Sequence, residues 1–421
     1  METFDVAVVG GGPGGSTTAT FLVEGGLRVA LFERERFPRF HVGESLMPAT
    51  MLLLEQLGVL EDVRRRGFQP KYGATFVDEE AGATQTFYFL PGQPWPNYAY
   101  QVPRAEFDTL LLEHARRRGV HVFQPVTVSD ARFDADGVTV AADAEGKRFE
   151  VRAAMLVDAS GRDAFMATRR GTRRRRPNLG KVALFAHWRG AERLSGIDEG
   201  NIRIHVFGDG WFWWIPLAGD LTSLGAVCHA RTARAFPGPM EALYASMIER
   251  CPGVARPLKG ARRVTPVYRA ANFAYDNVAA SGDRFVAVGD AVAFVDPIFS
   301  GGVYIAMRSG QLAARAILDG FRAGDLSARR FAAYERRVRA GLAPLFKFIH
   351  KYYEPAFFDL LMHPRDDFGI YRAVLNVLSG GSWVRFGWRT RLALALLFGI
   401  ARVNAFVRRA RGLPVESRLE W

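Results

Sequence analysis

Residues 4–15 read Phe-Asp-Val-Ala-Val-Val-Gly-Gly-Gly-Pro-Gly-Gly, an apolar run followed by six residues of which five are glycine. The apolar run is typical of a buried strand, and Ser16 to Glu24 continues in a pattern compatible with a helix. In such a strand–turn–helix unit Gly10 permits the tight turn, and Gly12 lets the backbone approach a pyrophosphate. Gly15 allows the helix to pack closely on the strand. The stretch therefore predicts a dinucleotide-binding site at the start of a doubly wound α/β fold.

The next residues extend this unit. Arg28 to Phe32 forms a second short strand-like run, and Glu33 follows it directly. At that spacing a carboxylate accepts hydrogen bonds from the adenosine ribose, while the helix N-terminus supplies positive potential for the phosphates. Together these features predict a bound dinucleotide, but they do not distinguish FAD from NAD.

The chain has 421 residues, 49% of them hydrophobic, which is more than one core usually needs. Strand-like and helical segments alternate early, strand-like segments dominate the middle, and helical patterns fill the end. We expect an α/β fold with three parts: a discontinuous Rossmann-like nucleotide-binding domain, an antiparallel-sheet subdomain on the substrate side, and a helical C-terminal extension. Their respective boundaries are 1–80, 98–180 and 280–325; 81–97 and 181–279; and 326–421.

The charge of the chain is strongly positive. Lysine and arginine total 56 against 43 acidic residues, a net charge of +13. Such a surface favours anionic partners, including an acidic carrier protein, although arginine-rich coding would give the same excess. No basic stripe interleaved with aromatic residues is visible, so we expect no nucleic acid as a partner. Cys228 and Cys251 are too few for a disulfide framework, which favours the cytoplasm.

Membrane attachment is not expected from the apolar segments. The first apolar run is the strand Val6 to Val9, with Asp5 before it, so we predict no secretory signal. The longest late stretch, Leu392 to Ala401, spans about ten residues and is too short to cross a bilayer. We expect it to form a buried amphipathic helix rather than a helix on a membrane surface.

Motifs further along the chain favour FAD over NAD as the bound dinucleotide. Ala287-Val-Gly289-Asp290-Ala291 and Gly43-Glu44-Ser45 resemble segments of FAD-dependent oxygenases and halogenases with the aromatic-hydroxylase fold. Arg104, in Tyr100-Gln-Val-Pro-Arg104, matches an arginine that those enzymes set near the cofactor. The resemblance implies that the Rossmann-like domain binds FAD, with Asp290 on the ribityl chain and Glu44, Ser45 and Arg104 beside the flavin. By residue type alone, Asp290 could equally be a helix N-cap.

Two further segments resemble the signatures of flavin-dependent halogenases. Trp211-Phe-Trp213-Trp-Ile-Pro216 fits a strand on which Trp211 and Trp213 share one face. Taken alone, it could be an ordinary buried aromatic wall. The second segment is Phe294-x-x-Pro297-x-x-Ser300-x-Gly302. The resemblance implies that the two indoles keep substrate away from the flavin, and that Pro297 and Gly302 contact the cofactor.

The turn Ser300-Gly301-Gly302 is a candidate halide site. Its backbone N–H groups precede a predicted helix, an arrangement typical of an anion nest for chloride or bromide. The alternative is a helix-start turn that only holds the flavin edge. We assign no metal ligands from the sequence.

Lys71, in Gln-Pro-Lys71-Tyr-Gly-Ala-Thr-Phe76, resembles the lysine of the halogenases that act on phenols and pyrroles. A buried lysine there could donate to hypohalous acid or form a transient haloamine. A solvated lysine before a strand is the other interpretation. Two departures are notable: Val77-Asp78-Glu79-Glu80 replaces a frequent tryptophan–glycine pair, and Phe299 stands where tryptophan-acting halogenases tend to have glutamate.

The resemblance therefore implies a flavin-dependent halogenase of secondary metabolism. Its FAD, reduced by a separate flavin reductase, would use dioxygen to convert chloride or bromide to hypohalous acid, and Trp211, Trp213 and Lys71 would be catalytic. The acceptor would be a phenol or pyrrole, free or on an acyl or peptidyl carrier protein. The alternatives are an FAD-dependent monooxygenase or isoprenoid/lipid reductase, and a non-enzymatic flavoprotein that binds an acidic partner. The C-terminal helices would cap the substrate entrance or offer a docking surface.

Overall fold

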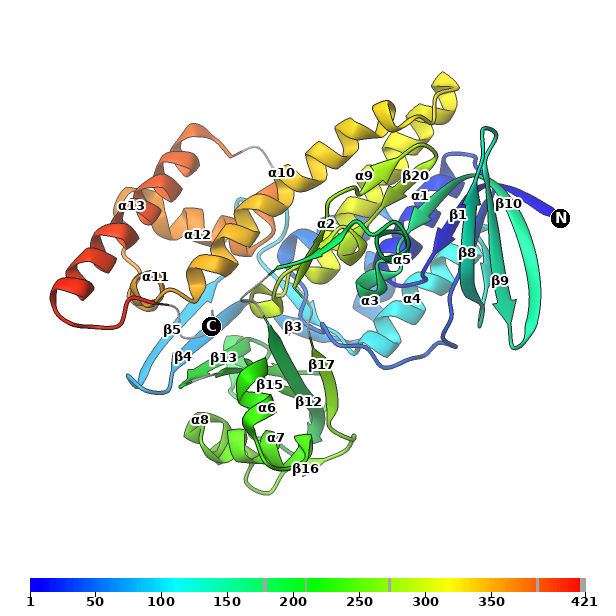
Figure 1. Cartoon of the computed structure of the whole chain (residues 1–421). Coiled ribbons are helices and arrows are strands. Elements are labelled where there is room, and N and C mark those ends of the chain that lie inside the picture. Colours follow the sequence, from blue (N-terminus) through cyan, green and yellow to red (C-terminus); the bar gives the residue numbers. More distant parts are fainter. Residues whose placement is uncertain (177–179, 209, 272–273, 384–385, 417–421) are drawn as a thin grey trace.

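A computed structural model describes residues 1–176, 180–208, 210–271, 274–383 and 386–416 (Figure 1). The first sheet has a parallel centre, since β1 pairs in parallel with β10 and β2. Its valine-rich central strands are buried on both faces, as parallel sheets require. The order is β19 (Ser281–Gly282), β20 (Phe285–Ala287), β10 (Lys147–Asp158), β1 (Glu2–Val9), β2 (Val29–Phe32) and β7 (His121–Phe123), with β8 (Thr127–Phe133) and β9 (Val138–Ala144) extending β10 as an antiparallel meander.

Helices cover this sheet and position the nucleotide-binding turn. The first helix, α1 (Pro13–Glu24), packs along α9 (Gly302–Ala323) and against α4 (Arg104–Arg117). A Cβ at Gly310 would lie 2.6 Å from Thr18 Oγ1 and 2.9 Å from the Gly14 carbonyl oxygen, so glycine permits the close approach of α1 and α9. The smaller helices nearby are α2 (Pro48–Gln56), α3 (Leu60–Arg65) and α5 (Phe165–Arg169).

The second sheet is antiparallel except for one pair. Its strands run in the order β16 (Arg262–Arg263), β12 (Lys181–Arg189), β15 (Leu221–His229), β14 (Gly210–Pro216), β13 (Ile202–Phe207), β4 (Gly73–Asp78) and β5 (Ala83–Tyr88), and β17 (Tyr268–Ala271) also pairs with β12. We placed β4 with the FAD-binding segments, but it pairs with β13 and β5 in this sheet. Because β13 is more than a hundred residues away, local patterning has no signal for that pairing.

The two faces of the second sheet support different cores. Trp211, Trp213 and Ile215 belong to the main core, whereas Phe212 and Trp214 belong to a second core. This confirms the predicted alternation along β14. The second core lies between this sheet and three helices, which are seen in the lower part of Figure 1. These helices are α6 (Ala230–Ala235), α7 (Met240–Glu249) and α8 (Pro252–Ala255). Two small sheets complete the fold: β3 (Gln69–Lys71) with β6 (Ala99–Gln101), and β11 (Arg173–Arg175) with β18 (Tyr275–Asn277) and β21 (Ala293–Phe294).

The predicted helical C-terminal extension is confirmed, so the α/β fold class with its three kinds of structure holds. The long helix α10 runs from the first domain toward the C-terminal helices, which pack together at one end of the molecule (Figure 1). The helices of the C-terminal region are α10 (Ala328–Tyr352), α11 (Pro355–Met362), α12 (Ile370–Leu378) and α13 (Trp388–Ala410). The final five residues of this region, 417–421, lie outside the described residues.

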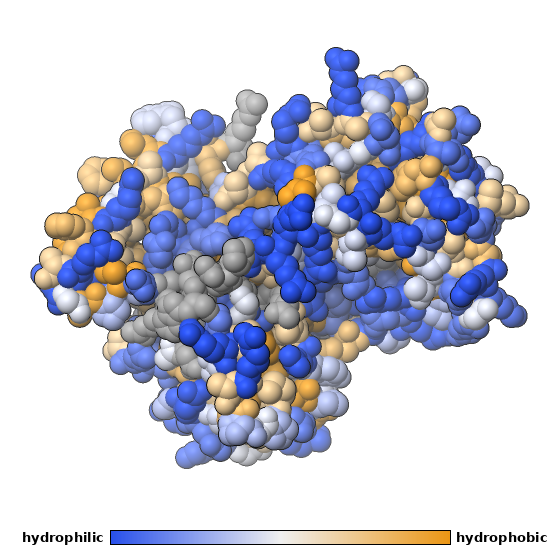
Figure 2. Space-filling view, in the orientation of Figure 1, coloured by the Kyte–Doolittle hydropathy of each residue, from blue (hydrophilic) through white to orange (hydrophobic). Residues whose placement is uncertain are grey.

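The expectation that the apolar stretch Leu392 to Ala401 lies in a buried helix is wrong, because most residues of this stretch are not buried. By length and composition α13, with 23 residues, could cross a membrane, and only 22% of its most apolar window is buried. A single such helix is weak support for a membrane protein. Its hydrophobic and hydrophilic side chains alternate on the surface (Figure 2). Four side chains of α13 pack inward, namely Ala393, Leu394, Leu397 and Ala401. Other apolar side chains of the helix remain exposed, including Trp388, Leu392, Val403 and Phe406.

Candidate active site

One cleft of about 860 Å³ brings together nearly all the site residues predicted from the sequence. Its walls come from the glycine-rich turn, the loop that follows β2, the tryptophans of β14 and the turn before α9. The predicted residues that line it are Gly10, Gly12, Glu33, Glu44, Ser45, Arg104, Trp211, Trp213, Asp290, Pro297, Ser300, Gly301 and Gly302. Gly15 and Lys71 are not among the residues that line this cleft.

The glycine-rich turn has the geometry of a dinucleotide cradle. Gly10 has φ +105°, and a Cβ there would lie 2.3 Å from the Ala159 carbonyl oxygen. A Cβ at Gly15 would lie 1.8 Å from the Gly10 carbonyl oxygen, which explains why Gly15 contributes through packing although it lies behind the cleft. Gly12 has space on its cleft side, where the nearest atom to a Cβ would be Arg39 Nη2 at 3.6 Å. The turn thus fits a pyrophosphate.

Glu33 is buried at the end of β2 and is fixed by the backbone. Its Oε2 accepts a hydrogen bond from Gly11 N at 2.7 Å, and its Oε1 accepts one from Glu35 N at 2.8 Å. Because the carboxylate still borders the cleft, its remaining lone pairs are available to a ribose hydroxyl.

Asp290 is half-buried and lines the same cleft. Burial raises the pKa of its carboxyl to about 6, against the opposing effects of Arg162 and Arg104. The N-cap of the short 3₁₀ turn Gly289–Ala291 is Val288, so the N-cap interpretation of Asp290 is wrong. A half-buried carboxyl that lines the cleft fits a polyhydroxyl chain, as FAD's ribityl group would provide.

Arg104 is held by an aspartate that sequence reasoning missed. Its Nε and Nη2 donate to both Asp108 carboxylate oxygens at 2.7 and 2.8 Å, and Arg39 also donates to Asp108. Asp108 follows Arg104 by four residues on α4, a spacing that would have indicated one helix face. Glu44 is likewise fixed by an unpredicted residue, His187 of β12, whose Nε2 lies 2.9 Å from Glu44 Oε1.

The two signature tryptophans form one wall of the cleft. The ring centroids of Trp211 and Trp213 are 6.1 Å apart. Trp213 lies across Gly225, where a Cβ would be 2.1 Å from the indole, and its Nε1 donates to Ser223 Oγ at 3.2 Å. Trp211 Nε1 donates to the Tyr353 hydroxyl at 3.1 Å. Since both indole N–H groups have partners, both rings are fixed in orientation.

A buried ion pair links this wall to the turn before α9. Lys181 Nζ donates to Asp296 Oδ2 at 3.1 Å, and both side chains are about 1% exposed. Asp296 Oδ1 accepts from Ile298 N, which caps the turn Pro297–Phe299. Lys181 Nζ also lies 3.2 Å from the ring centroid of Tyr353, the partner of Trp211. No pattern in the sequence indicates this network, although Asp296 lies inside the second signature.

The backbone at Ser300 and Gly301 has the alternating handedness of an anion nest, although the Ser300 N–H itself donates to the Pro297 carbonyl oxygen at 2.9 Å. Ser300 is left-handed, with φ +57° and ψ +26°, whereas Gly301 is right-handed, with φ −80° and ψ −16°. Successive residues of opposite hand form an anion nest, and Gly302 begins the 22-residue helix α9. A Cβ at Gly302 would meet no atom within 4 Å, so there is space beside the turn.

Lys71 lies at the end of β3 with only 3% of its surface exposed. Its Nζ donates to Ser45 Oγ at 2.8 Å and to the Leu46 carbonyl oxygen at 3.1 Å, and it lies 5.4 Å from the Phe89 ring centroid. Burial lowers the pKa of the amine to about 7. The solvated interpretation of Lys71 is therefore wrong: one side chain, Ser45, connects the amine to the cleft.

Aromatic residues from the C-terminal region pack beside the signatures. Phe299 contacts Phe76 of β4 and Tyr352 of α10, with ring centroids 6.3 and 5.6 Å apart. Tyr352 in turn packs on Tyr353, the residue that holds Trp211. The end of α10 thus closes over the tryptophan wall and the turn before α9.

The comparisons with known proteins agree with this geometry. Residues 3–340 match the FAD binding domain family, so the chain is an FAD-binding flavoprotein. It is 32% identical over 374 residues to the 1H-pyrrole-2-carbonyl-[peptidyl-carrier protein] chlorinase of Pseudomonas fluorescens, covering 83% of each chain. The chain belongs to the family of flavin-dependent halogenases.

Two solved structures share the fold over nearly the whole chain. A flavoprotein/dehydrogenase from Cytophaga hutchinsonii has a TM-score of 0.88 at 28% identity, covering 97% of this chain and 100% of that one. The flavin-dependent brominase Bmp2 has a TM-score of 0.84 at 30% identity, covering 95% and 100%. The predicted FAD-dependent oxidoreductase of halogenase type, with halide and dioxygen as reactants, is confirmed. The monooxygenase, reductase and non-enzymatic alternatives are not favoured.

Proposed function

We propose that this halogenase acts on an electron-rich aromatic ring, a pyrrole or a phenol, presented by an acidic carrier protein. A separate flavin reductase would deliver reduced FAD. The relative from Pseudomonas fluorescens, matched over 83% of its length, is named for a pyrrole group on a peptidyl carrier protein. The net charge of +13 complements an acidic partner. In the described residues neither cysteine is in a disulfide, which supports placement in the cytoplasm.

The cleft residues would hold FAD along its length. The Gly10–Gly15 turn would face the pyrophosphate, Glu33 the adenosine ribose, and Asp290 the ribityl chain. Glu44, Ser45, Arg104, Pro297 and Gly302 would border the flavin. When bound in its reduced form, FAD would activate dioxygen, and the activated oxygen would oxidise halide to hypohalous acid.

The protein's own groups would then bind the halide and keep the aromatic acceptor away from the flavin. The nest at Ser300, Gly301 and Gly302 would bind chloride or bromide through the backbone N–H groups of Gly301 and Gly302 and the positive end of α9, since the Ser300 N–H donates to Pro297. Trp211 and Trp213 would exclude an aromatic acceptor from the cofactor while a small species passes. This separation disfavours direct hydroxylation at the flavin, the chemistry of the monooxygenase alternative.

The observation that supports this proposal most strongly is the position of Lys71. Its amine is buried, hydrogen-bonded to Ser45 and one side chain removed from the cleft. A cation with this placement can orient hypohalous acid toward an aromatic carbon by donating a hydrogen bond. Holding Lys71 Nζ with two acceptors, Ser45 Oγ and the Leu46 carbonyl oxygen, fixes where its third proton points.

We expect the rate of halogenation to fall as pH rises through about 7. Burial lowers the pKa of Lys71 to about 7, so the ammonium form predominates below that pH and the neutral amine above it. Only the ammonium has a third proton for hypohalous acid. The measurement is kcat/KM for bromination across this pH range, with bromide oxidation followed in parallel by a small diffusible scavenger. A rate that rises with pH would instead indicate the neutral amine and a haloamine.

The carrier proposal predicts a marked salt dependence. With a flavin reductase, NADH, dioxygen and bromide supplied, kcat/KM for a pyrrole-2-carbonyl group on a carrier should fall by roughly tenfold or more as salt rises to about 0.5 M, since screening weakens long-range attraction. The free aromatic acceptor serves as the matched control and should change little. If tethered and free acceptors respond alike, the carrier proposal fails although the halogenase chemistry stands.

A further inference from the structure

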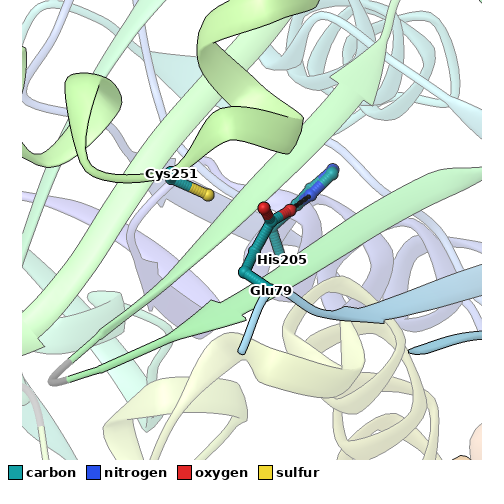
Figure 3. A group of neighbouring side chains, drawn as sticks. All are labelled: Glu79, His205 and Cys251. Carbon is teal, nitrogen blue, oxygen red and sulfur yellow. Dashed lines mark hydrogen bonds and ion pairs between the residues drawn. The ribbon is translucent and has the colours of Figure 1, made fainter. Parts of the chain in front are cut away.

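A polar cluster lies on the opposite face of the second sheet from the tryptophan wall. Glu79 directly follows β4, His205 lies on β13, and Cys251 precedes α8. His205 pairs across the sheet with Phe212, whose neighbours Trp211 and Trp213 point to the other face. Figure 3 shows the three side chains converging, with the Cys251 thiol pointing toward the Glu79 carboxylate. The cluster is therefore separate from the flavin cleft.

The three side chains offer ligand atoms at close range. One atom from each lies within 4.8 Å of the others. His205 Nδ1 is 2.6 Å from Glu79 Oε1, and Glu79 Oε2 accepts a hydrogen bond from Gly253 N at 3.0 Å. His205 is 3% exposed and Cys251 is fully buried, while Glu79 reaches the surface. An ion could thus enter from the Glu79 side and be shielded once bound.

The backbone leaves room for the cluster by means of a glycine. A Cβ at Gly253 would lie 2.1 Å from Glu79 Oε1 and 2.9 Å from His205 Nδ1. Any other residue would displace both side chains. Glu79 belongs to Val77-Asp78-Glu79-Glu80, the stretch that departs from the frequent tryptophan–glycine pair, and its partner Cys251 belongs to the second core.

We propose that Glu79, His205 and Cys251 form a binding site for a divalent cation of the zinc class. A thiolate, an imidazole and a carboxylate are the ligands that Zn²⁺ prefers, and a water molecule would complete four-coordination. Bonds of about 2.0–2.3 Å place neighbouring ligand atoms roughly 3.3–3.8 Å apart in a tetrahedral site. The Glu79–His205 pair would therefore widen by about 0.7 Å as the ion replaces the proton between them, and the Cys251 thiol would release its own proton to solvent on becoming a ligand.

A bound ion would join three segments that are far apart in the chain. It would attach the α7–α8 unit to β13 and to the end of β4, beneath the strand that presents the two signature tryptophans. With three protein ligands from three elements, binding would stabilise the folded chain because the unfolded chain holds no such arrangement.

The test uses full-length, FAD-loaded protein after removal of any affinity tag and treatment with a chelator. We expect calorimetric titration with Zn²⁺ to show about one equivalent per chain and the thermal unfolding midpoint to rise when Zn²⁺ is added. Co²⁺ should give d–d absorption at wavelengths beyond those of the flavin, with a thiolate contribution. Cys251→Ser and Glu79→Gln should each lose the binding and the rise in midpoint.

Matched controls separate a metal site from a change in folding. Cys228→Ser replaces the other buried cysteine, and Glu80→Gln replaces the neighbouring acid; both should keep one equivalent of Zn²⁺. If Cys251→Ser does not fold, Glu79→Gln and His205→Gln still decide the question. The proposal is overturned if the wild-type protein takes up no stoichiometric Zn²⁺, or if the Glu79 variant binds it equally well; the cluster is then a hydrogen-bonded support only.

Discussion

Replacement of Lys71 by methionine is expected to reduce halogenation of the aromatic acceptor by at least about 100-fold. The physical reason is that the variant removes the buried ammonium to which the proposed function assigns the orienting of hypohalous acid, while methionine fills a similar volume. Binding of FAD should not change, because Lys71 does not line the cleft. The measurement is the single-turnover yield of halogenated product after reduction of the bound flavin.

The informative control is the fate of the oxidised halide in the Lys71→Met variant. Bromide oxidation, followed by trapping hypohalous acid with a small scavenger, should continue at close to the wild-type rate. A matched substitution is Lys147→Met, since Lys147 is exposed on the hairpin at the start of β10; this variant should halogenate normally. Wild-type halogenation by Lys71→Met would exclude the amine from the reaction, and loss of bromide oxidation as well would assign Lys71 to the flavin side.

The nucleotide-binding half of the site could be predicted from the sequence because its signals are local. Gly10, Gly12, Gly15 and Glu33 act through turn geometry and strand ends that lie within a span of about thirty residues. The shared face of Trp211 and Trp213 could also be predicted from the sequence, because side chains alternate along a strand with a period of two and place Trp214 on the other face.

The supporting contacts could not be predicted because they join distant segments. Glu44 is fixed by His187, and Trp211 by Tyr353, at sequence separations of 143 and 142 residues. No periodicity in one chain reports which distant strand or helix end will lie beside a given loop. The same limit hid the pairing of β4 with β13 and the contact of α10 with the turn before α9.

The burial of individual side chains was also beyond sequence reasoning. Residue type alone leaves Lys71 either buried or solvated, and the structure buries it. For α13 the apolar pattern predicts a buried face but does not show how much of the helix stays exposed. Tertiary packing decided both outcomes.

Replacement of Lys181 by methionine is expected to lower the free energy of unfolding by about 3–5 kcal/mol. Lys181 and Asp296 form an ion pair with both side chains about 1% exposed, so the variant leaves a carboxylate buried without its cation. Asp296 also caps the turn Pro297–Phe299, and Lys181 packs on Tyr353, the partner of Trp211. Loss of the pair should therefore also raise the KM for bromide, because the nest begins where this turn ends.

A double-mutant cycle measures the coupling directly. Denaturant unfolding of Lys181→Met, Asp296→Asn and the double variant should show that the double variant loses less stability than the sum of the single losses, since asparagine removes the unpaired charge and can still accept from Ile298 N. The exposed Lys147→Met variant should change the free energy of unfolding by less than about 0.5 kcal/mol. Additive losses would show that the two side chains stabilise the fold independently, and an unchanged KM for bromide would separate the ion pair from the halide turn.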